Sequence, residues 1–189
     1  DLDGTITSRN VFLEFIRYAA GTGRFAAGLL LLSPLIVLHW MGVISSRRIK
    51  EIVLGHFFRG TAEARLAVLA EGFRRERLPG MLRASAMERI RWHQAQGDRV
   101  AIVSACVEDW VRGWCRELGV ALVATRVEVR DGALTGRLLG ENCHGEEKVR
   151  RIREALDLSA FEYIFAYGDS PGDRPMLALA HEGYYAPFG

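Results

Sequence analysis

Apolar side chains in the first half of the chain recur at the spacing of helices. A polar stretch rich in Gly, Thr and Ser predicts a loop over residues 1–10, and a helical repeat follows over 11–20. Residues 49–95 predict further helices with Arg-rich exposed faces, interrupted near Gly60 and near Pro79-Gly80. We therefore expect this half of the chain to be helical.

Short β-branched runs alternate with helical segments from Gly97-Asp98 onward. Strands are predicted at 99–103, 120–129, 163–167 and 183–186, and helices at 107–118, 146–156 and 175–181. The Asp131-Gly132 pair predicts a hairpin turn. Such alternation is typical of an α/β protein with a parallel sheet and helices on both faces. We therefore divide the chain into a core, 1–10 and 81–189, and an all-helical insertion at 11–80.

Residues 25–44 form an uncharged, mainly apolar run. As a helix this run would extend about 30 Å, which is enough to cross a bilayer. Ser33-Pro34 divides the run into two halves, so the sequence also allows a helical hairpin in one leaflet, or helices on the membrane surface. Arg47, Arg48 and Lys50 follow it and could meet anionic lipid headgroups. The alternative is that the run forms the buried core of the insertion or a dimer contact.

Charge and cysteine content narrow the possible functions. Lys plus Arg is 25 and Asp plus Glu is 23, and the net charge of +2 argues against a nucleic-acid-binding protein. The three cysteines are odd in number and lack the spacing of metal ligands, which indicates a reducing compartment. The chain opens directly on Asp1-Leu2-Asp3, which is typical of a strand end, so we expect residues to precede Asp1.

Two acidic residues lie close together at the start of the chain, in the segment Asp1-Leu2-Asp3-Gly4-Thr5. On an extended segment residues i and i+2 point the same way. At the end of a strand this brings both carboxylates to one crevice, where open α/β sheets bind ligands. Gly4 permits a tight turn and a close approach of the backbone to an anion. The alternative is an ordinary Asp-rich turn.

Three further segments carry polar groups at or near predicted strand ends. Asp169 and Asp173 could complete an oxygen-rich site of the kind that Mg²⁺ prefers, although Ser-Pro-Gly-Asp is also common turn composition. Ser104 could donate to a phosphate oxygen or cap the helix that follows. Lys148 could neutralise a phosphate oxygen or remain a solvated lysine.

Together the four segments resemble the haloacid dehalogenase superfamily of phosphohydrolases. Their order is D-x-D-G-T, a strand ending in Ser, a Lys, and a strand ending in G-D-S-x-x-D. The match covers residues 1–5 and 97–187, and the helical insertion resembles the superfamily's type 1 cap. Residues 126–136 are similar to the hairpin of the phosphoserine phosphatase-like branch. The resemblance implies a Rossmannoid parallel sheet whose central first strand lies just before Asp1.

The resemblance also implies a role for each candidate residue. Asp1 would be the nucleophile that forms an aspartyl-phosphate, and Asp3 would be the acid and base. Mg²⁺ would be held by Asp1, Asp169 and the backbone carbonyl of Asp3. Asp173 would support these ligands from the second coordination sphere. The phosphoryl oxygens would be bound by four residues with suitable donors: Gly4, Ser104, Ala105 and Lys148.

Two departures separate this chain from the usual phosphoserine phosphatase pattern. The second motif is Ser104-Ala105-Cys106 rather than Ser-Gly-Gly, and residues 5–13 contain no acid to hold an amino group. A single membrane crossing at 25–44 would put Asp1 and Lys148 on opposite sides of the membrane. Of the membrane arrangements, only a helical hairpin in one leaflet or helices on the surface therefore remain. With its apolar run at 25–44, the chain looks like the branch of the superfamily that includes a bacterial phosphatidylglycerophosphatase.

We therefore expect a Mg²⁺-dependent phosphomonoesterase acting on a lipid phosphate at the cytoplasmic face of the membrane. The second hypothesis is the same chemistry on a small soluble phosphate ester, with the apolar run buried in the cap or in a dimer. The third is an inactive membrane-associated scaffold, which the intact set of acidic residues argues against.

Overall fold

The computed structural model describes residues 1–188. The N-terminal half contains five α-helices: α1 (Val11–Ala20), α2 (Thr22–Trp40), α3 (Ser46–Phe58), α4 (Glu63–Glu76) and α5 (Ala84–Ala95). A short 3₁₀ helix, Leu78–Met81, precedes α5. The predicted interruptions near Gly60 and Pro79-Gly80 are confirmed, because both lie between helices. At Gly60 the backbone has φ near +79°, a conformation that only glycine adopts readily.

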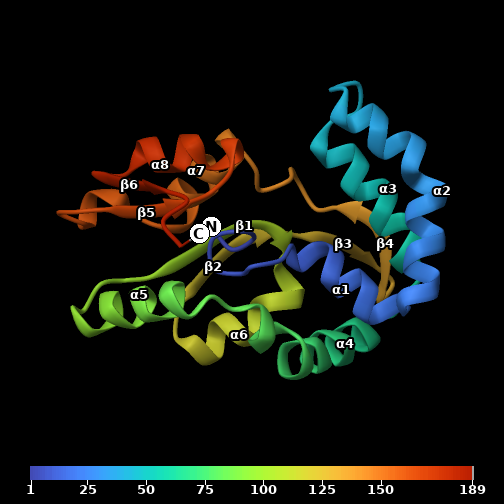
Figure 1. Cartoon of the computed structure of the whole chain (residues 1–189), viewed down its shortest axis with the longest axis horizontal. Helices are drawn as coiled ribbons and strands as arrows, with labels where there is room; N and C mark the ends of the chain where they lie inside the picture. Colours follow the sequence, from blue (N-terminus) through green and yellow to red (C-terminus); the bar gives the residue numbers. More distant parts are fainter. Residues whose placement is uncertain (189) are drawn as a thin grey trace.

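Strands and helices alternate through the C-terminal half, as the sequence predicts. The strands are β1 (Ala101–Val107), β2 (Ala121–Thr125), β3 (Val127–Arg130), β4 (Ala133–Leu138), β5 (Phe165–Gly168) and β6 (Glu182–Tyr185). The helices are α6 (Glu108–Leu118), α7 (Glu146–Ala155) and α8 (Arg174–Leu179), with 3₁₀ turns at Leu158–Ala160 and Pro171–Asp173. Figure 1 shows α6 on one side of β1 and α7 on the other. The α/β fold with a parallel core is therefore confirmed.

The parallel core consists of two hydrogen-bonded pairs. β1 pairs with β2, with Ala101 opposite Ala121, and β5 pairs with β6, with Phe165 opposite Glu182. Within residues 1–188 these two pairs are not hydrogen-bonded to each other. A mainly apolar cavity of about 540 Å³ lies between them, and Asp1 borders it. The central strand expected just before Asp1 stays a prediction.

β1 is longer than the predicted strand 99–103, and this changes the position of Ser104. Ser104 pairs with Ala124 and Val107 pairs with Thr125, so Ala105 and Cys106 form a bulge between them. The alternative role for Ser104, as the cap of the next helix, is wrong. The residue that precedes α6 is Val107, and no side chain caps that helix. The reason is that the strand continues to Val107, four residues beyond the end of the predicted strand 99–103.

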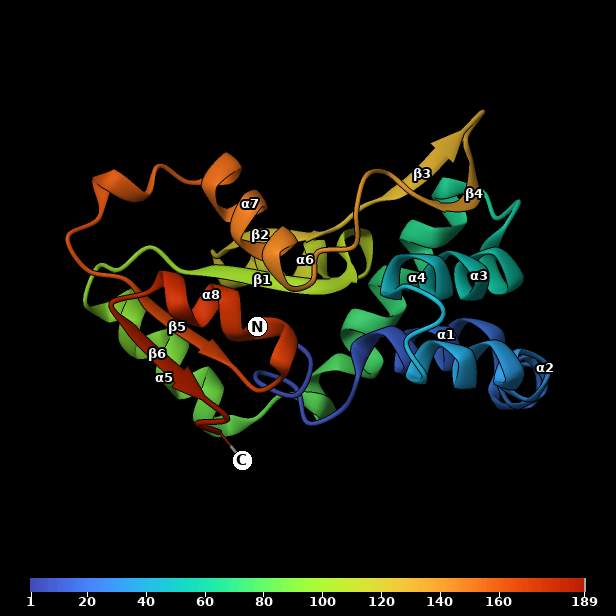
Figure 2. The same cartoon turned by 90° about the horizontal axis from the view of Figure 1, so that it is seen from above.

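The predicted strand 120–129 is divided into β2 and β3, and β3 forms an antiparallel hairpin with β4. The hairpin turn at Asp131-Gly132 is confirmed, and both residues have positive φ angles. This hairpin lies against the cap helix α3, at the same end of the molecule as α1, α2 and α4 (Figure 2). The contact is close: a Cβ on Gly136 would lie 2.5 Å from the Cα of Gly55.

A shared aromatic cluster joins the cap helices to the core. Phe15 of α1 stacks on Trp110 of α6 with ring centroids 4.1 Å apart, and Phe58 and Phe73 pack around them. Phe15, Phe73 and Trp110 are almost completely buried. Large buried aromatic rings contribute strongly to packing, so α1 is held firmly against α6.

Residues 25–40 of the apolar run lie in one continuous helix, α2, which ends before residues 41–44, and the predicted division at Ser33-Pro34 is wrong. A helical proline cannot donate to the carbonyl four residues earlier, which here is that of Leu30. The hydroxyl of Ser33 donates to this same carbonyl at 2.8 Å and replaces the lost bond. The helix therefore passes through Pro34, and a membrane hairpin with its turn at that position is excluded.

Most of α2 lies on the surface. It is the one helix among the described residues that is long and apolar enough to span a membrane, and only 11% of that span is buried. Gly28 and Leu32 face the cap, whereas Leu30, Leu31 and Trp40 are strongly exposed. The cap-core alternative is therefore wrong for the outward face of this helix.

Candidate active site

The loop before α1 brings Asp1 and Gly4 against the loop that follows β5. The backbone nitrogen of Asp1 donates to the carbonyl of Tyr167 at 2.6 Å. Gly4 has φ near +86°, and a Cβ there would lie 2.2 Å from a carboxylate oxygen of Asp169. Glycine is thus required at this position. Thr5 donates its hydroxyl to the Asp169 carboxylate at 2.8 Å, which further fixes the two loops together.

Three carboxylates gather where these loops meet. Oxygens of Asp1, Asp169 and Asp173 lie within 4.8 Å of one another. Such a set of hard oxygen donors suits Mg²⁺, which binds a few carboxylates and keeps several waters. The three acidic residues predicted from two separate motifs are therefore brought together, whereas the Asp3 side chain is not part of this cluster.

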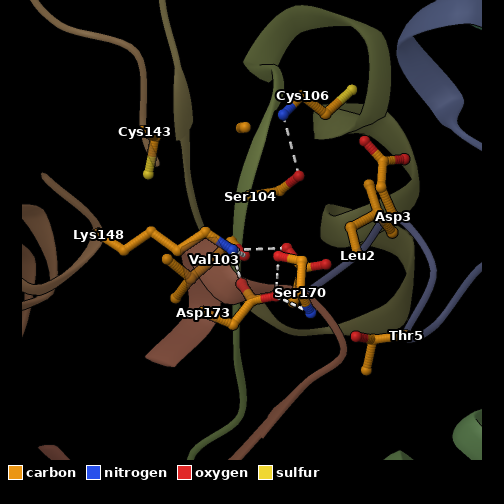
Figure 3. Close-up of polar contacts among 12 residues, drawn as sticks. Leu2, Asp3, Thr5, Val103, Ser104, Cys106, Cys143, Lys148, Ser170 and Asp173 are labelled. Carbon is orange, nitrogen blue, oxygen red and sulfur yellow. Dashed lines mark hydrogen bonds and ion pairs between the residues drawn. The ribbon is translucent and has the colours of Figure 1, made fainter. Parts of the chain in front are cut away.

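Lys148 contacts two of these acids, and Figure 3 shows its side chain reaching Asp173. Its ammonium donates to Asp1 at 2.6 Å, to Asp173 at 2.5 Å and to the carbonyl of Val103 at 3.3 Å. The lysine is only 2% exposed, so the alternative of a solvated lysine is wrong. A buried ammonium is tolerated because two carboxylates and a carbonyl satisfy it.

Asp173 is held as a carboxylate by several donors. Its second oxygen accepts hydrogen bonds from the backbone nitrogen of Ser170 at 2.9 Å and from the Ser170 hydroxyl at 2.6 Å. Burial alone would raise the pKa of Asp173, but the charge of Lys148 and these hydrogen bonds lower it to about 2. Asp173 is thus a fixed negative charge that orients Lys148 as well as a member of the acidic cluster.

Asp3 has a different environment. Its carboxylate accepts a hydrogen bond from the backbone nitrogen of Val11 at 2.7 Å, at the first turn of α1. Burial raises the pKa of Asp3 to about 6, although the Val11 bond and the charges of Lys50 and Lys148 act in the opposite direction. A carboxyl group with a pKa near neutrality is suited to both donating and accepting a proton.

Ser104 and Ala105 lie at the bulge of β1. Ser104 is fully buried, and its hydroxyl oxygen accepts a hydrogen bond from the backbone nitrogen of Cys106 at 2.9 Å. The neighbouring carbonyl of Val103 contacts Lys148. The second motif therefore borders the cluster of Asp1, Lys148 and Asp173.

Sequence reasoning missed the position of Lys50. We expected this residue to meet lipid headgroups, but its ammonium donates to the carbonyl of Ala105 at 2.5 Å and to the side-chain oxygen of Asn142 at 2.6 Å. Arg47 is engaged with Glu51 and Glu141, so Arg48 is the most exposed of the three basic residues. A useful signal was available in the composition: Lys50 is one of only two lysines, the other being the active-site Lys148.

Comparison with known proteins gives consistent relatives. The chain is 34% identical to the protein CicA of Caulobacter vibrioides over 192 residues, covering 100% of this chain and 84% of that protein. It is 33% identical over 129 residues to phosphoserine phosphatase SerB1 of Mycobacterium tuberculosis, covering 65% of this chain and 41% of that protein. A solved structure of a protein of unknown function from Bordetella pertussis Tohama I has a TM-score of 0.85 and 30% identity, over 95% of this chain and 84% of that chain.

The profile of the haloacid dehalogenase-like hydrolases matches residues 1–178. That range includes the loop of Asp1 and Asp3, the cap helices, the bulge at Ser104, and the Lys148 and Asp169 motifs. Because this match spans far more than half of the chain, it identifies the family. The chain belongs to the haloacid dehalogenase-like hydrolases.

Proposed function

We propose that this hydrolase cleaves phosphate monoesters with Asp1 as the nucleophile. An Asp1 oxygen attacks phosphorus, the bond to the ester oxygen breaks, and the Asp3 carboxyl gives its proton to that leaving oxygen. Asp3 then takes a proton from a water molecule that attacks the same phosphorus, which releases phosphate and restores the Asp1 carboxylate. The observation that carries this proposal is the buried set of Asp1, Lys148 and Asp173 beside the raised pKa of Asp3.

The chain's own residues bind and orient the phosphoryl group. Lys148 offers positive charge, Ser104 offers its hydroxyl, and Ala105 offers its backbone N–H. The predicted donor at Gly4 is not available in this structure, because its N–H donates to the carbonyl of Thr7 at 3.0 Å. Phosphoryl transfer depends mainly on positioning and charge stabilisation, which these groups supply. Asp1, Asp169 and the backbone carbonyl of Asp3 would hold Mg²⁺. When bound, this ion would neutralise negative charge on the phosphoryl group.

For the substrate, we propose a lipid phosphate, such as phosphatidylglycerophosphate, taken at the cytoplasmic surface of the membrane. The support is the outward face of α2, on which Leu30, Leu31 and Trp40 are exposed beside the exposed Arg48. Large exposed apolar patches mark binding surfaces. A helix lying in the membrane interface would present the cap and its catalytic cleft to headgroups while the core stays in water.

A small soluble ester of the phosphoserine kind is the second candidate. It is favoured by the similarity to phosphoserine phosphatase SerB1, which spans 65% of this chain. In that case the exposed face of α2 would contact another protein surface, such as a second copy of the chain.

A turnover ratio separates the two candidates. Phosphate release is measured with phosphatidylglycerophosphate in mixed micelles and with phosphoserine and an aryl phosphate in solution. Leu30→Glu and Leu31→Glu place a charge on the exposed face of α2, and a charge at membrane depth costs about 2.5–3.5 kcal/mol. We expect both variants to lose lipid turnover by more than tenfold and to keep aryl phosphate turnover.

Val68→Glu is the matched control, because Val68 is also an exposed apolar residue of the cap, on α4. It should leave the ratio of lipid to soluble turnover unchanged. An unchanged ratio in the α2 variants would reject the lipid substrate, and preferential turnover of phosphoserine would favour the soluble ester. No Mg²⁺-dependent turnover of any of the three substrates would reject the phosphatase proposal and favour the inactive scaffold.

A further inference from the structure

One charged side chain of the cap reaches the bulge of β1, next to Ser104. Lys50 extends from α3, and its ammonium lies 5.2 Å from the ring centroid of Phe12 in α1. Its two hydrogen-bond acceptors belong to the core: the carbonyl of Ala105 in the bulge of β1, and Asn142 in the segment before α7. No feature of the proposed reaction so far requires a lysine at this position.

The Ala105 carbonyl that Lys50 binds shares a peptide group with the backbone nitrogen of Cys106. That nitrogen donates to the Ser104 hydroxyl oxygen at 2.9 Å, within a fully buried segment. Because the oxygen accepts this bond, the hydroxyl proton is left to donate to a phosphoryl oxygen. A cation on the carbonyl end of a peptide also polarises it and strengthens the bond that its N–H donates.

The bulge makes this peptide dependent on Lys50. Ala105 and Cys106 lie between the paired residues Ser104 and Val107, so β2 does not fix their peptide as it fixes the rest of the strand. Bulges redirect side chains and backbone groups next to functional sites. The Lys50 contact therefore supplies an orientation that sheet pairing does not provide here.

Asn142 fixes Lys50 in turn. Its side-chain oxygen accepts from both Lys50 and Thr125, and its side-chain nitrogen donates to Ser46 at 3.3 Å. Ser46 and Lys50 are four residues apart and so lie on one face of α3. The Asn142 side chain is buried, and its oxygen, also bound by Thr125, holds the Lys50 ammonium against the bulge.

We propose that Lys50 is a positioning residue for phosphoryl transfer, which aims the Ser104 hydroxyl at the phosphoryl group through the Ala105–Cys106 peptide. The cap then does more than select the substrate, because docking of α3 completes a phosphate-binding group of the core. This inference rests on the proposed phosphatase function, since it assigns Ser104 to the phosphoryl oxygens.

The test uses Lys50→Met, which keeps the length of the side chain and removes its charge and donors. With an aryl phosphate, which has no second anionic group for Lys50 to bind, we expect kcat to fall about tenfold. Affinity for inorganic phosphate, measured by titration calorimetry with Mg²⁺ present, should fall by a similar factor. Lys50→Arg should recover most of both losses, and Lys50→Gln should show an intermediate effect.

A double-mutant cycle shows whether Lys50 acts through Ser104. Once Ser104→Ala has removed the hydroxyl, adding Lys50→Met should lower kcat and phosphate affinity by less than twofold further. If the double variant instead loses activity by the product of the two single losses, the two residues act independently and the proposal is overturned. An unchanged phosphate affinity in Lys50→Met, or a loss confined to substrates with a second anionic group, would also overturn it.

Ser46→Ala is the matched control for cap docking, because it removes the other bond from α3 to Asn142 and leaves the Lys50–Ala105 contact in place. We expect kcat within twofold of the wild type, and an equal loss in both variants would overturn the proposal in favour of simple docking. Thermal unfolding of each variant identifies loss of folding, in which case Lys50→Gln replaces Lys50→Met. Calorimetry measures phosphate binding without any turnover. If the wild-type chain binds phosphate but hydrolyses none of the esters, the proposed function is rejected. The binding data for the Lys50 variants still test the role of Lys50.

Discussion

The cluster of Asp1, Lys148, Asp169 and Asp173 and the helix α2 are opposite in composition and in burial. At the cluster, Lys148 and Asp173 are charged and almost completely buried. On α2, Leu31 is apolar and 67% exposed, and Trp40 is 79% exposed. Both regions thus depart from the usual arrangement of apolar interior and charged surface.

The two departures are balanced in different ways. In the cluster Lys148 pairs with both Asp1 and Asp173, so these buried charges are balanced within the chain. On α2 no partner among residues 1–188 covers the outward face. The cluster still holds three carboxylates for one ammonium, an excess of negative charge that suits a cation, whereas the outward face of α2 offers apolar surface and little charge.

The largest effect is expected from removing the nucleophile. Asp1→Asn cannot form an acyl phosphate, so phosphate release should fall by at least about 10⁴-fold. Mass spectrometry should find no phosphorylated intermediate in this variant. Asp131→Asn, at the exposed hairpin turn, is the control and should keep full activity, because Asn also accepts a positive φ. A phosphate trapped on another residue would contradict the assignment of Asp1.

The second effect concerns the cation of the cluster. Lys148→Met should reduce transition-state stabilisation by about 3–4 kcal/mol, a loss in kcat of roughly 10²- to 10³-fold. The variant also leaves Asp1 and Asp173 without their shared counter-charge. Arg153→Met, on the exposed face of the same helix, should change kcat by less than twofold. Equal losses in the two variants would mean that helix α7 matters only for folding.

Two adjacent leucines sharpen the contrast within α2. Leu32 is 7% exposed and Leu31 is 67% exposed. Leu32→Ala should lower the free energy of unfolding by about 2–3 kcal/mol, because it leaves a cavity between α2 and its neighbours. Leu31→Ala should change it by less than about 0.5 kcal/mol. Urea denaturation measures both, and similar losses would show that the outward face is covered in solution.

The smallest effect is expected at the proline of α2. Pro34→Ala restores a backbone N–H for the Leu30 carbonyl, and a helical proline can cost about 3 kcal/mol. Because Ser33 already donates to that carbonyl, the gain in unfolding free energy should be only about 1 kcal/mol. Thermal unfolding provides the measurement. A decrease in stability would mean that Pro34 stabilises a bend required by the cap.

Local features of the sequence were sufficient for the fold class and for most of the site. Alternating strands and helices predicted the α/β core, and the Asp131-Gly132 pair predicted its hairpin turn. The acidic residues Asp1, Asp169 and Asp173 were found from their positions after strands, because parallel strands bring such positions to one edge. Each of these signals is contained within a few consecutive residues, so no knowledge of packing was needed to find it.

Contacts between distant segments decided the rest. The continuity of α2 at Pro34 depends on one side-chain hydrogen bond, and the exposure of its outward face depends on which helices pack against it. The approach of Lys50 to Ala105 joins residues 55 positions apart and depends on the docking of α3 and on a bulge that periodicity does not reveal. Sequence patterns determine which residues prefer burial and which carry chemistry. Only the tertiary structure decides which of them meet, because that choice depends on the summed packing of the whole chain.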